Sequence, residues 1–167
     1  VLMGVTILGS IKVKANSILI KRNHFAQKVG GCNSSIILEA SNVLIVQNYI
    51  EMIDGANTAS LIQVTAGRSG IIINNNVFFH NCSGCGGGVL ALSTPASSTL
   101  EVSNNIFKGG INVANAIVQN NFFNTDNTFV ASASIVRNNI HTNGYLPVGN
   151  GNVNSSPLDL RYIDTGS

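Results

Sequence analysis

The chain has 167 residues, of which 44% are hydrophobic and 10% are charged, and its formal net charge is +2. This hydrophobic content supports a continuous core and excludes a disordered chain. Because the few lysines and arginines are scattered and every apolar run is short, we expect no nucleic-acid partner and no membrane insertion.

A six-residue motif recurs along the chain, from Ile20–Phe25 in its first copy to Val136–His141 in its last. Each copy has a central asparagine, with Ile or Val three positions before it and Phe, Ile or, once, His two positions after it. β-Branched residues before the asparagine and a large residue after it fit a short strand, a bend and a second short strand. The central asparagines are Asn23, Asn48, Asn76, Asn105, Asn121 and Asn139.

We expect each central asparagine to form the bend itself, in the left-handed backbone conformation that asparagine adopts more readily than other residues except glycine. Its side-chain amide would then bond to the asparagine of the next coil and build an asparagine ladder. Subtraction of the residue numbers gives steps of 25, 28, 29, 16 and 18 residues between these asparagines. In a solenoid the longer steps locate outward loops, here residues 26–34, 51–60 and 80–98.

These features predict an all-β fold, a right-handed parallel β-helix solenoid of about six to seven coils with an asparagine ladder. The β-helix body is expected over residues 1–143, followed by an irregular C-terminal tail or cap over residues 144–167. An antiparallel sandwich or barrel is the structural alternative, since it also has many short strands. It would not require the same asparagine in every unit, so the β-helix is favoured.

The recurrent Asn-Asn-hydrophobic-Phe motif, from about Ile18 to Ile140, resembles the right-handed parallel β-helix superfamily of pectin-lyase-like solenoids, which are common in secreted proteins. The tail from Gly149 to Leu158 is similar to the closing segment of large secreted bacterial β-helix proteins. This resemblance implies an extracellular or cell-surface location and a longer parent polypeptide. It does not imply a reaction, because a fold does not carry a function.

The resemblance implies clustered carboxylates in those members that cleave acidic polysaccharides. In this chain the seven acids are scattered, and the closest pair is Glu51 and Asp54. This pair could bind a cation or serve as acid and base, although a solvated loop tip is the more common case. No catalytic residue is therefore assigned, and no cofactor is expected.

His80, Cys82 and Cys85 form a His-x-Cys-x-x-Cys sequence, which is one ligand short of a structural zinc set. We expect no metal there, and we expect either a disulfide between Cys82 and Cys85 or two unpaired thiols. His141 replaces the usual Phe or Ile and is expected to mark a last, partly open coil. The doublet Phe122-Phe123 is expected to place one ring inside, and an outer ring there could stack on a sugar.

Two hypotheses of function follow from these features. The first is a non-catalytic extracellular or cell-surface scaffold, such as a stalk, adhesin segment or filament-forming subunit, which self-associates end to end through residues 5–8 and contacts carbohydrate. The alternative is a polysaccharide lyase or glycoside hydrolase of the pectin-lyase-like superfamily, with a groove between the long loops. The scarcity of charge and the missing carboxylate cluster favour the scaffold.

Overall fold

The structure is a computed structural model, and it describes residues 1–28, 34–53, 60–81, 90–95, 97–124, 129–132, 134–142, 146–147 and 149–154. Within these ranges the chain forms 21 short strands and no helix. All the strand pairings among these residues are parallel, and they join the strands into three sheets. The predicted all-β class is confirmed.

The three sheets are called A, B and C. Sheet A contains β1 (Leu2–Met3), β4 (Ile18–Lys21), β7 (Val43–Val46), β10 (Ile71–Asn74), β13 (Leu100–Ser103), β16 (Ala116–Gln119) and β19 (Ile135–Arg137). Sheet B contains β2 (Thr6–Ile7), β5 (His24–Lys28), β8 (Tyr49–Ile53), β11 (Val77–Asn81), β14 (Ile106–Lys108), β17 (Phe122–Phe123), β20 (Ile140–His141) and β21 (Val153–Asn154). Sheet C contains β3 (Ile11–Val13), β6 (Ile36–Leu38), β9 (Ile62–Val64), β12 (Leu90–Ser93), β15 (Gly110–Ala114) and β18 (Phe129–Ser132).

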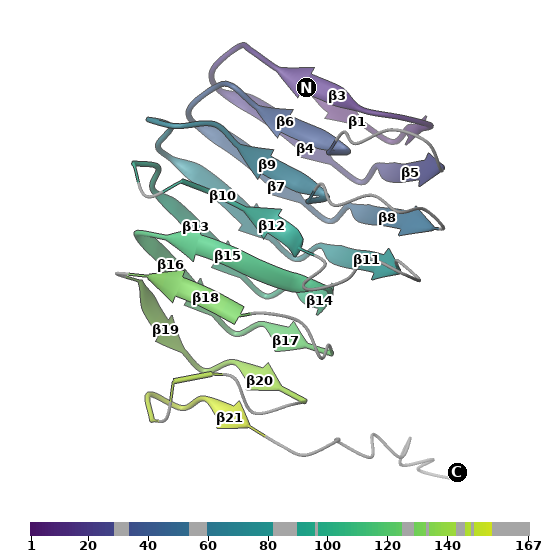
Figure 1. Cartoon of the computed structure of the whole chain (residues 1–167). Helices are drawn as coiled ribbons and strands as arrows, with labels where there is room; N and C mark the ends of the chain where they lie inside the picture. The colour runs from purple at the N-terminus through teal and green to yellow at the C-terminus, as the bar shows by residue number, and fades with distance from the viewer. Residues whose placement is uncertain are drawn as a thin grey trace, which may run out of the picture.

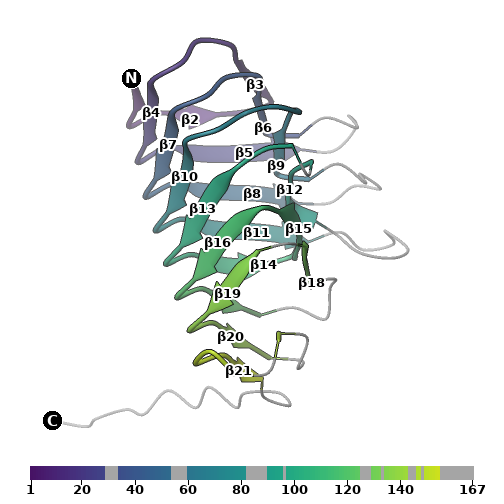
Figure 2. The same ribbon diagram turned by 90° about the vertical axis from the view of Figure 1, so that its left-hand side faces the viewer.

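Through most of the chain, successive strands pass from sheet A to B to C and back to A, so that every third strand pairs in the same sheet. The chain is therefore wound into a parallel β-helix of about seven coils, as the repeat predicted (Figure 1). Figure 2 shows the coils stacked one below another, with the strands of sheet A in one continuous column. Each coil thus contacts the coils above and below it, as in other solenoids.

The core fills the space between the three sheets, and both predicted inward positions of the motif lie in it. The residue three positions before the ladder asparagine is buried in every copy, from Ile20 at 0% exposure to Val136 at 6%. The position two residues after the asparagine holds a column of buried rings in the later coils. Phe107 stacks on Phe78 and on Phe123, with ring centroids 4.6 and 5.0 Å apart.

His141 continues this column of rings, 5.9 Å from Phe123, and is fully buried. The expectation that it marks a partly open coil is therefore wrong. The chain beyond it closes the coil, because Leu146 joins the core and β21 pairs with β20. Residues 155–167 of the predicted tail lie outside the described part of the chain.

The six predicted asparagines form a continuous ladder. From Asn48 to Asn139, the Oδ1 atom of each accepts hydrogen bonds from the backbone N–H and from Nδ2 of the ladder asparagine one coil earlier, at 2.9–3.1 Å. Asn139 bonds in the same way to Asn152, which adds a seventh member that the motif search missed. The predicted ladder is confirmed and is one residue longer.

The predicted conformation of these asparagines is wrong, because the left-handed residue is the one before each of them. Asn75, for example, has φ 54° and is exposed, whereas Asn76 is 1% exposed. The physical reason is that one left-handed residue turns the chain, and the following residue then points its amide inward. The left-handed residues of the six motif copies are Arg22, Gln47, Asn75, Asn104, Asn120 and Asn138.

The connections from sheet B to sheet C vary most in length. Residues 29–35 join β5 to β6 and residues 82–89 join β11 to β12, whereas Gly109 alone joins β14 to β15. The predicted loops began too early, since their first residues still belong to strands of sheet B. The third predicted loop, 80–98, also contains β12.

Candidate functional site

The outer face of sheet B brings aromatic, acidic and basic side chains together in the described part of the chain. Because side chains alternate along a strand, the residue after each ladder asparagine points outward. The register aligns these residues in one column: His24, Tyr49, Val77, Ile106, Phe122 and Ile140. A second column two residues further on holds Ala26, Glu51, Phe79 and Lys108.

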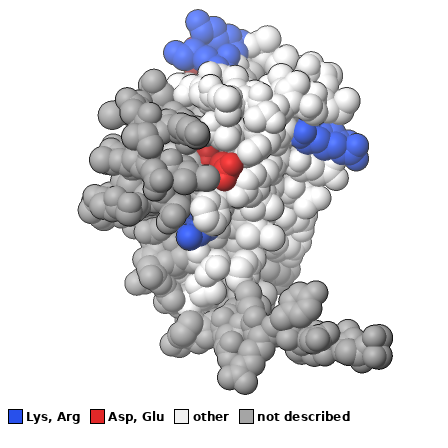
Figure 3. Space-filling model, turned by 90° about the vertical axis from the view of Figure 1, so that its right-hand side faces the viewer, with Lys and Arg blue, Asp and Glu red and all other residues white. Residues whose placement is uncertain are grey.

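Most side chains of the first column are apolar, and several of them are exposed to solvent. Tyr49 and Ile140 are each 38% exposed and Ile106 is 49% exposed. Figure 3, which views the molecule from the side of sheet B, shows a mostly uncharged surface with few acidic and basic atoms. Aligned aromatic and aliphatic side chains at about 4.8 Å spacing form a flat strip suited to an extended ligand.

Glu51 is the centre of a polar cluster on the described part of this face. Its Oε1 atom lies 2.6 Å from Nε2 of His24, and the ring of His24 is 5.3 Å from the ring of Tyr49. The side chain of Glu51 is 13% exposed and that of His24 is 40% exposed. The carboxylate is therefore largely enclosed and already has an imidazole partner.

The surroundings of Tyr49 favour the protonated form of its phenol group. Burial raises the pKa of Tyr49, and the negative charge of Glu51 together with a side-chain hydrogen bond to Glu51 raises that pKa further. The phenol therefore acts as a neutral hydrogen-bond donor to the carboxylate. It is not suited to be a base, because its ionised form is disfavoured.

Phe79 and Lys108 form a second pair on the same face. The Nζ atom of Lys108 lies 4.4 Å from the centre of the Phe79 ring, within the range of a cation–π contact. The expectation of one inner and one outer ring is also met at Phe122 and Phe123, which are half-buried and 1% exposed, respectively. A ring and a cation beside each other can contact both the face of a sugar and its hydroxyl groups.

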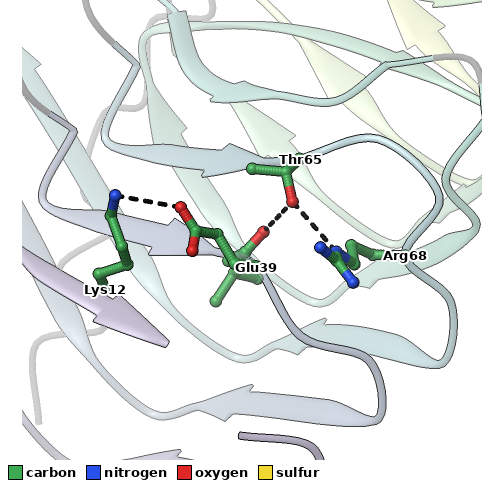
Figure 4. Close-up of polar contacts among 5 residues, drawn as sticks. Lys12, Glu39, Thr65 and Arg68 are labelled. Atoms are coloured by element: carbon green, nitrogen blue, oxygen red, sulfur yellow. Dashed lines mark hydrogen bonds and ion pairs between the residues drawn. The ribbon is translucent and has the colours of Figure 1, made fainter. Parts of the chain in front are cut away.

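A further polar network lies away from this face, beside sheet C. Lys12 forms an ion pair with Glu39 at 3.0 Å, and Nε of Arg68 donates to Oγ1 of Thr65 at 3.1 Å (Figure 4). The Thr65 hydroxyl in turn donates to the carbonyl of Leu38 at 2.9 Å. These contacts link neighbouring coils, and the exposed ion pair contributes only about 0–1 kcal/mol to stability. We assign them a structural role.

The other predicted site residues are only partly placed. Glu51 is bonded to His24 and Tyr49, and its expected partner Asp54 lies outside the described residues. Cys82 and Cys85 also lie outside them, so their expected disulfide or thiol state stays a prediction. His80 lies on β11, is 3% exposed and belongs to the inward-facing set of that strand.

No group of three His, Cys, Asp or Glu side chains in the described ranges is placed to hold a metal ion. The same part of the chain has no helix with the length and apolar character needed to cross a bilayer. Neither finding assigns a function.

The cluster around Glu51 was missed by sequence reasoning because His24 and Glu51 are 27 residues apart. The repeat did contain the signal, since aligning Asn23 with Asn48 places His24 beside Tyr49 and Ala26 beside Glu51. Glu51 then lies diagonally across from His24, within reach of its side chain.

The fold and the composition of the outer face of sheet B are thus known from the structure of this chain itself. Its strands and ladder identify an all-β parallel β-helix with about seven coils. Comparison with protein-family models, with curated proteins and with solved structures finds no significant match.

Proposed function

We propose that the chain is a non-catalytic β-helical scaffold of the extracellular space or cell surface that contacts carbohydrate through the outer face of sheet B. The observation that carries this proposal is the outward-facing column that contains the exposed Tyr49 and Ile106 and the half-buried Phe122, on a face with few charges. Aromatic rings bury a large apolar area while Tyr keeps a polar end, which suits the mixed surface of a sugar.

The described acids support a scaffold rather than a hydrolase. Hydrolysis of a glycosidic bond ordinarily uses two carboxyl groups, roughly 5–10 Å apart, on either side of the bond. Glu51 lies on sheet B, whereas Glu101 lies on sheet A and Glu39 follows β6 of sheet C. Glu51 is also bound to His24, so it does not face a second described carboxylate across the strip.

Binding to a glycan panel tests this proposal, with Tyr49→Ala and Phe122→Ala as the diagnostic variants. Loss of one stacking ring is expected to weaken binding about three- to tenfold, equivalent to about 0.7–1.4 kcal/mol. Leu44→Ala is the matched control, because it removes a half-exposed side chain from the outer face of sheet A. Absence of binding to every glycan, or equal binding by all variants, would contradict the proposal.

A polysaccharide lyase or glycoside hydrolase remains the second candidate, and the cluster of Glu51, His24 and Tyr49 is what favours it. These three side chains could position a proton donor and acceptor beside a bound sugar. In that case Glu51→Gln would abolish formation of new reducing ends or unsaturated products from polysaccharide. Complete inactivity of the unaltered chain, with and without calcium, would exclude this candidate.

End-to-end association is the further component of the scaffold proposal. Val5 is 42% exposed and Leu8 is 79% exposed, and among the described strands β2, which lies between them, pairs with β5 alone. An unpaired strand edge flanked by apolar side chains is suited to pair with another strand. Electron microscopy should show elongated particles that become shorter in Leu8→Asp, and uniform single rods at high concentration would contradict this component.

A further inference from the structure

The outer face of sheet A carries an aliphatic column that is interrupted by a single carboxylate. The register aligns Leu19, Leu44, Ile72, Glu101, Ile117 and Ile135 along six successive coils. Leu44, Ile72 and Ile117 are each 37% exposed and Ile135 is 57% exposed. Because adjacent strands are about 4.8 Å apart, these side chains form an apolar strip with Glu101 as its one charged member.

This strip is accessible. Figure 2 shows the strands of sheet A stacked from β4 to β19 along the left-hand side of the view, with sheets B and C behind them and to their right and no described segment beyond them on the left. The turn that follows each strand is tight, since a single left-handed residue such as Arg22 or Asn75 reverses its direction. A row of exposed apolar side chains on such a face is a feature of interaction surfaces.

Glu101 has neutral hydrogen-bond partners on this face. It accepts from Oγ of Ser103 at 2.9 Å and from Nε2 of Gln119 at 3.5 Å. Lys21 lies on the same face, three coils away and one column across. Neither Glu101 nor Lys21 forms an ion pair with any other residue in the described ranges. A carboxylate in an apolar strip would gain most from a cation supplied by a partner.

We infer that this face binds a second copy of the chain, face to face, with the two helix axes antiparallel. With the two-fold axis between β7 and β10, Leu44 of each copy packs on Ile72 of the other. The same symmetry brings Lys21 of each copy to Glu101 of the other, so two ion pairs flank the apolar centre. A parallel arrangement would instead oppose Glu101 to Glu101 and Lys21 to Lys21. Charge complementarity therefore selects the antiparallel dimer.

The expected dimer is weak. Four coils of strands four residues long give a flat contact of roughly 15–20 Å by 13 Å, well below the area of about 800 Å² per partner that stable complexes bury. We expect a reversible dimer with a Kd on the order of 0.1 mM. Such a contact would become significant where many copies are held close together, because tethering raises the effective concentration.

Sedimentation equilibrium from about 10 µM to 1 mM tests this inference with charge-reversal variants. Lys21→Glu and Glu101→Lys are each expected to weaken the dimer at least about fivefold, and the double variant K21E/E101K is expected to restore it. Ile72→Lys should abolish the dimer. Its matched control is Ile106→Lys on the outer face of sheet B, which should dimerise normally.

Two further controls separate the proposed contact from others. Leu8→Asp removes an apolar side chain from the end of the rod and should leave the lateral dimer unchanged. Arg137→Glu tests the other cation on this face, whose Nε is already bonded to Gln119 at 2.9 Å, and should also have no effect. A monomer at all concentrations, a dimer sensitive to Arg137→Glu instead of Lys21→Glu, or failure of the double reversal to restore dimerisation would overturn the inference.

Discussion

Asn75 and Asn76 are adjacent in the chain but differ in backbone conformation and in burial. Asn75 turns the chain with a positive φ and points to solvent, whereas Asn76 points inward and bonds to Asn48 and Asn105. The sequence did distinguish the two positions, because Arg22 and Gln47 replace the first asparagine in the early copies. A position that accepts Arg or Gln needs a backbone conformation only, whereas an invariant amide needs its particular side chain.

Asn76→Ala is expected to lower the free energy of unfolding by about 3 kcal/mol, because it removes the acceptor of the buried backbone N–H of Asn48. Asn75→Ala is the matched control, and its cost of at most about 1 kcal/mol reflects the left-handed backbone alone. Denaturant unfolding measures both values. Equal losses in the two variants would contradict the division of roles within the doublet.

Tyr49 makes stability depend on pH in the alkaline range. Burial and Glu51 raise the pKa of Tyr49 in the folded chain above its ordinary value of 10.0. Between these two pKa values the unfolded chain binds fewer protons, so the stabilising contribution is complete below pH about 10 and is lost as pH rises through the folded pKa.

Alkaline titration of tyrosine absorbance, compared with that of Tyr49→Phe, is expected to show Tyr49 ionising later than an exposed tyrosine. Glu51→Gln should lower this pKa only in part, since burial is the larger cause. A Tyr49 that titrates at or below its ordinary value would contradict the described cluster.

Within sheet B, packing between coils restricts the residue types on the inner face of each strand but not those on the outer face. The inner positions, such as Phe78 and Phe107, are fixed by stacking between coils, and the sequence predicted them because the repeat preserves them. The outer positions, such as His24 and Tyr49, vary freely between copies because no core constrains them. Their contacts follow from the register, so the candidate site could be found only after the coils were aligned.

Phe107→Ala is expected to cost about 3–5 kcal/mol, because it leaves a cavity between two stacked rings in the fully buried column. Ile106→Ala removes an adjacent outward side chain that is 49% exposed and should cost about 1 kcal/mol or less. Thermal or denaturant unfolding compares the two. Similar costs at both positions would show that the inner column is not packed as described.

The last coil depends on Gly151, which stands where earlier copies have a left-handed Asn, Gln or Arg. Its φ is 72°, and a Cβ atom there would collide with Oδ1 of Asn138 in the preceding coil. This glycine also explains why the motif search missed Asn152.

Gly151→Ala is expected to destabilise the last coil by about 1–2 kcal/mol, and adding Asn138→Gly should relieve the collision but not the left-handed strain. Amide hydrogen exchange in β20 and β21 reports this local change. Unaltered exchange in Gly151→Ala would show that the last turn is built differently.

As a whole molecule, the chain is a stack in which stability is a sum of coil and coil-to-coil contributions. The sequence predicted this architecture because one side-chain amide per coil must meet its equivalent in the next. It could not predict which face is functional, because core packing does not constrain the outward-facing side chains of a solenoid. The structure adds the polar cluster around Glu51 on sheet B and the apolar strip on sheet A.

Side-chain amide NMR of a ¹⁵N-labelled sample tests the ladder most directly. The Nδ2 protons of the ladder asparagines should exchange slowly and show contacts from each coil to the next, linking Asn23, Asn48, Asn76, Asn105, Asn121, Asn139 and Asn152 in that order. The exposed neighbours, Asn75, Asn104, Asn120 and Asn138, provide an internal control that should exchange rapidly. Rapid exchange of both sets, with no contacts between successive ladder amides, would contradict the wound stack.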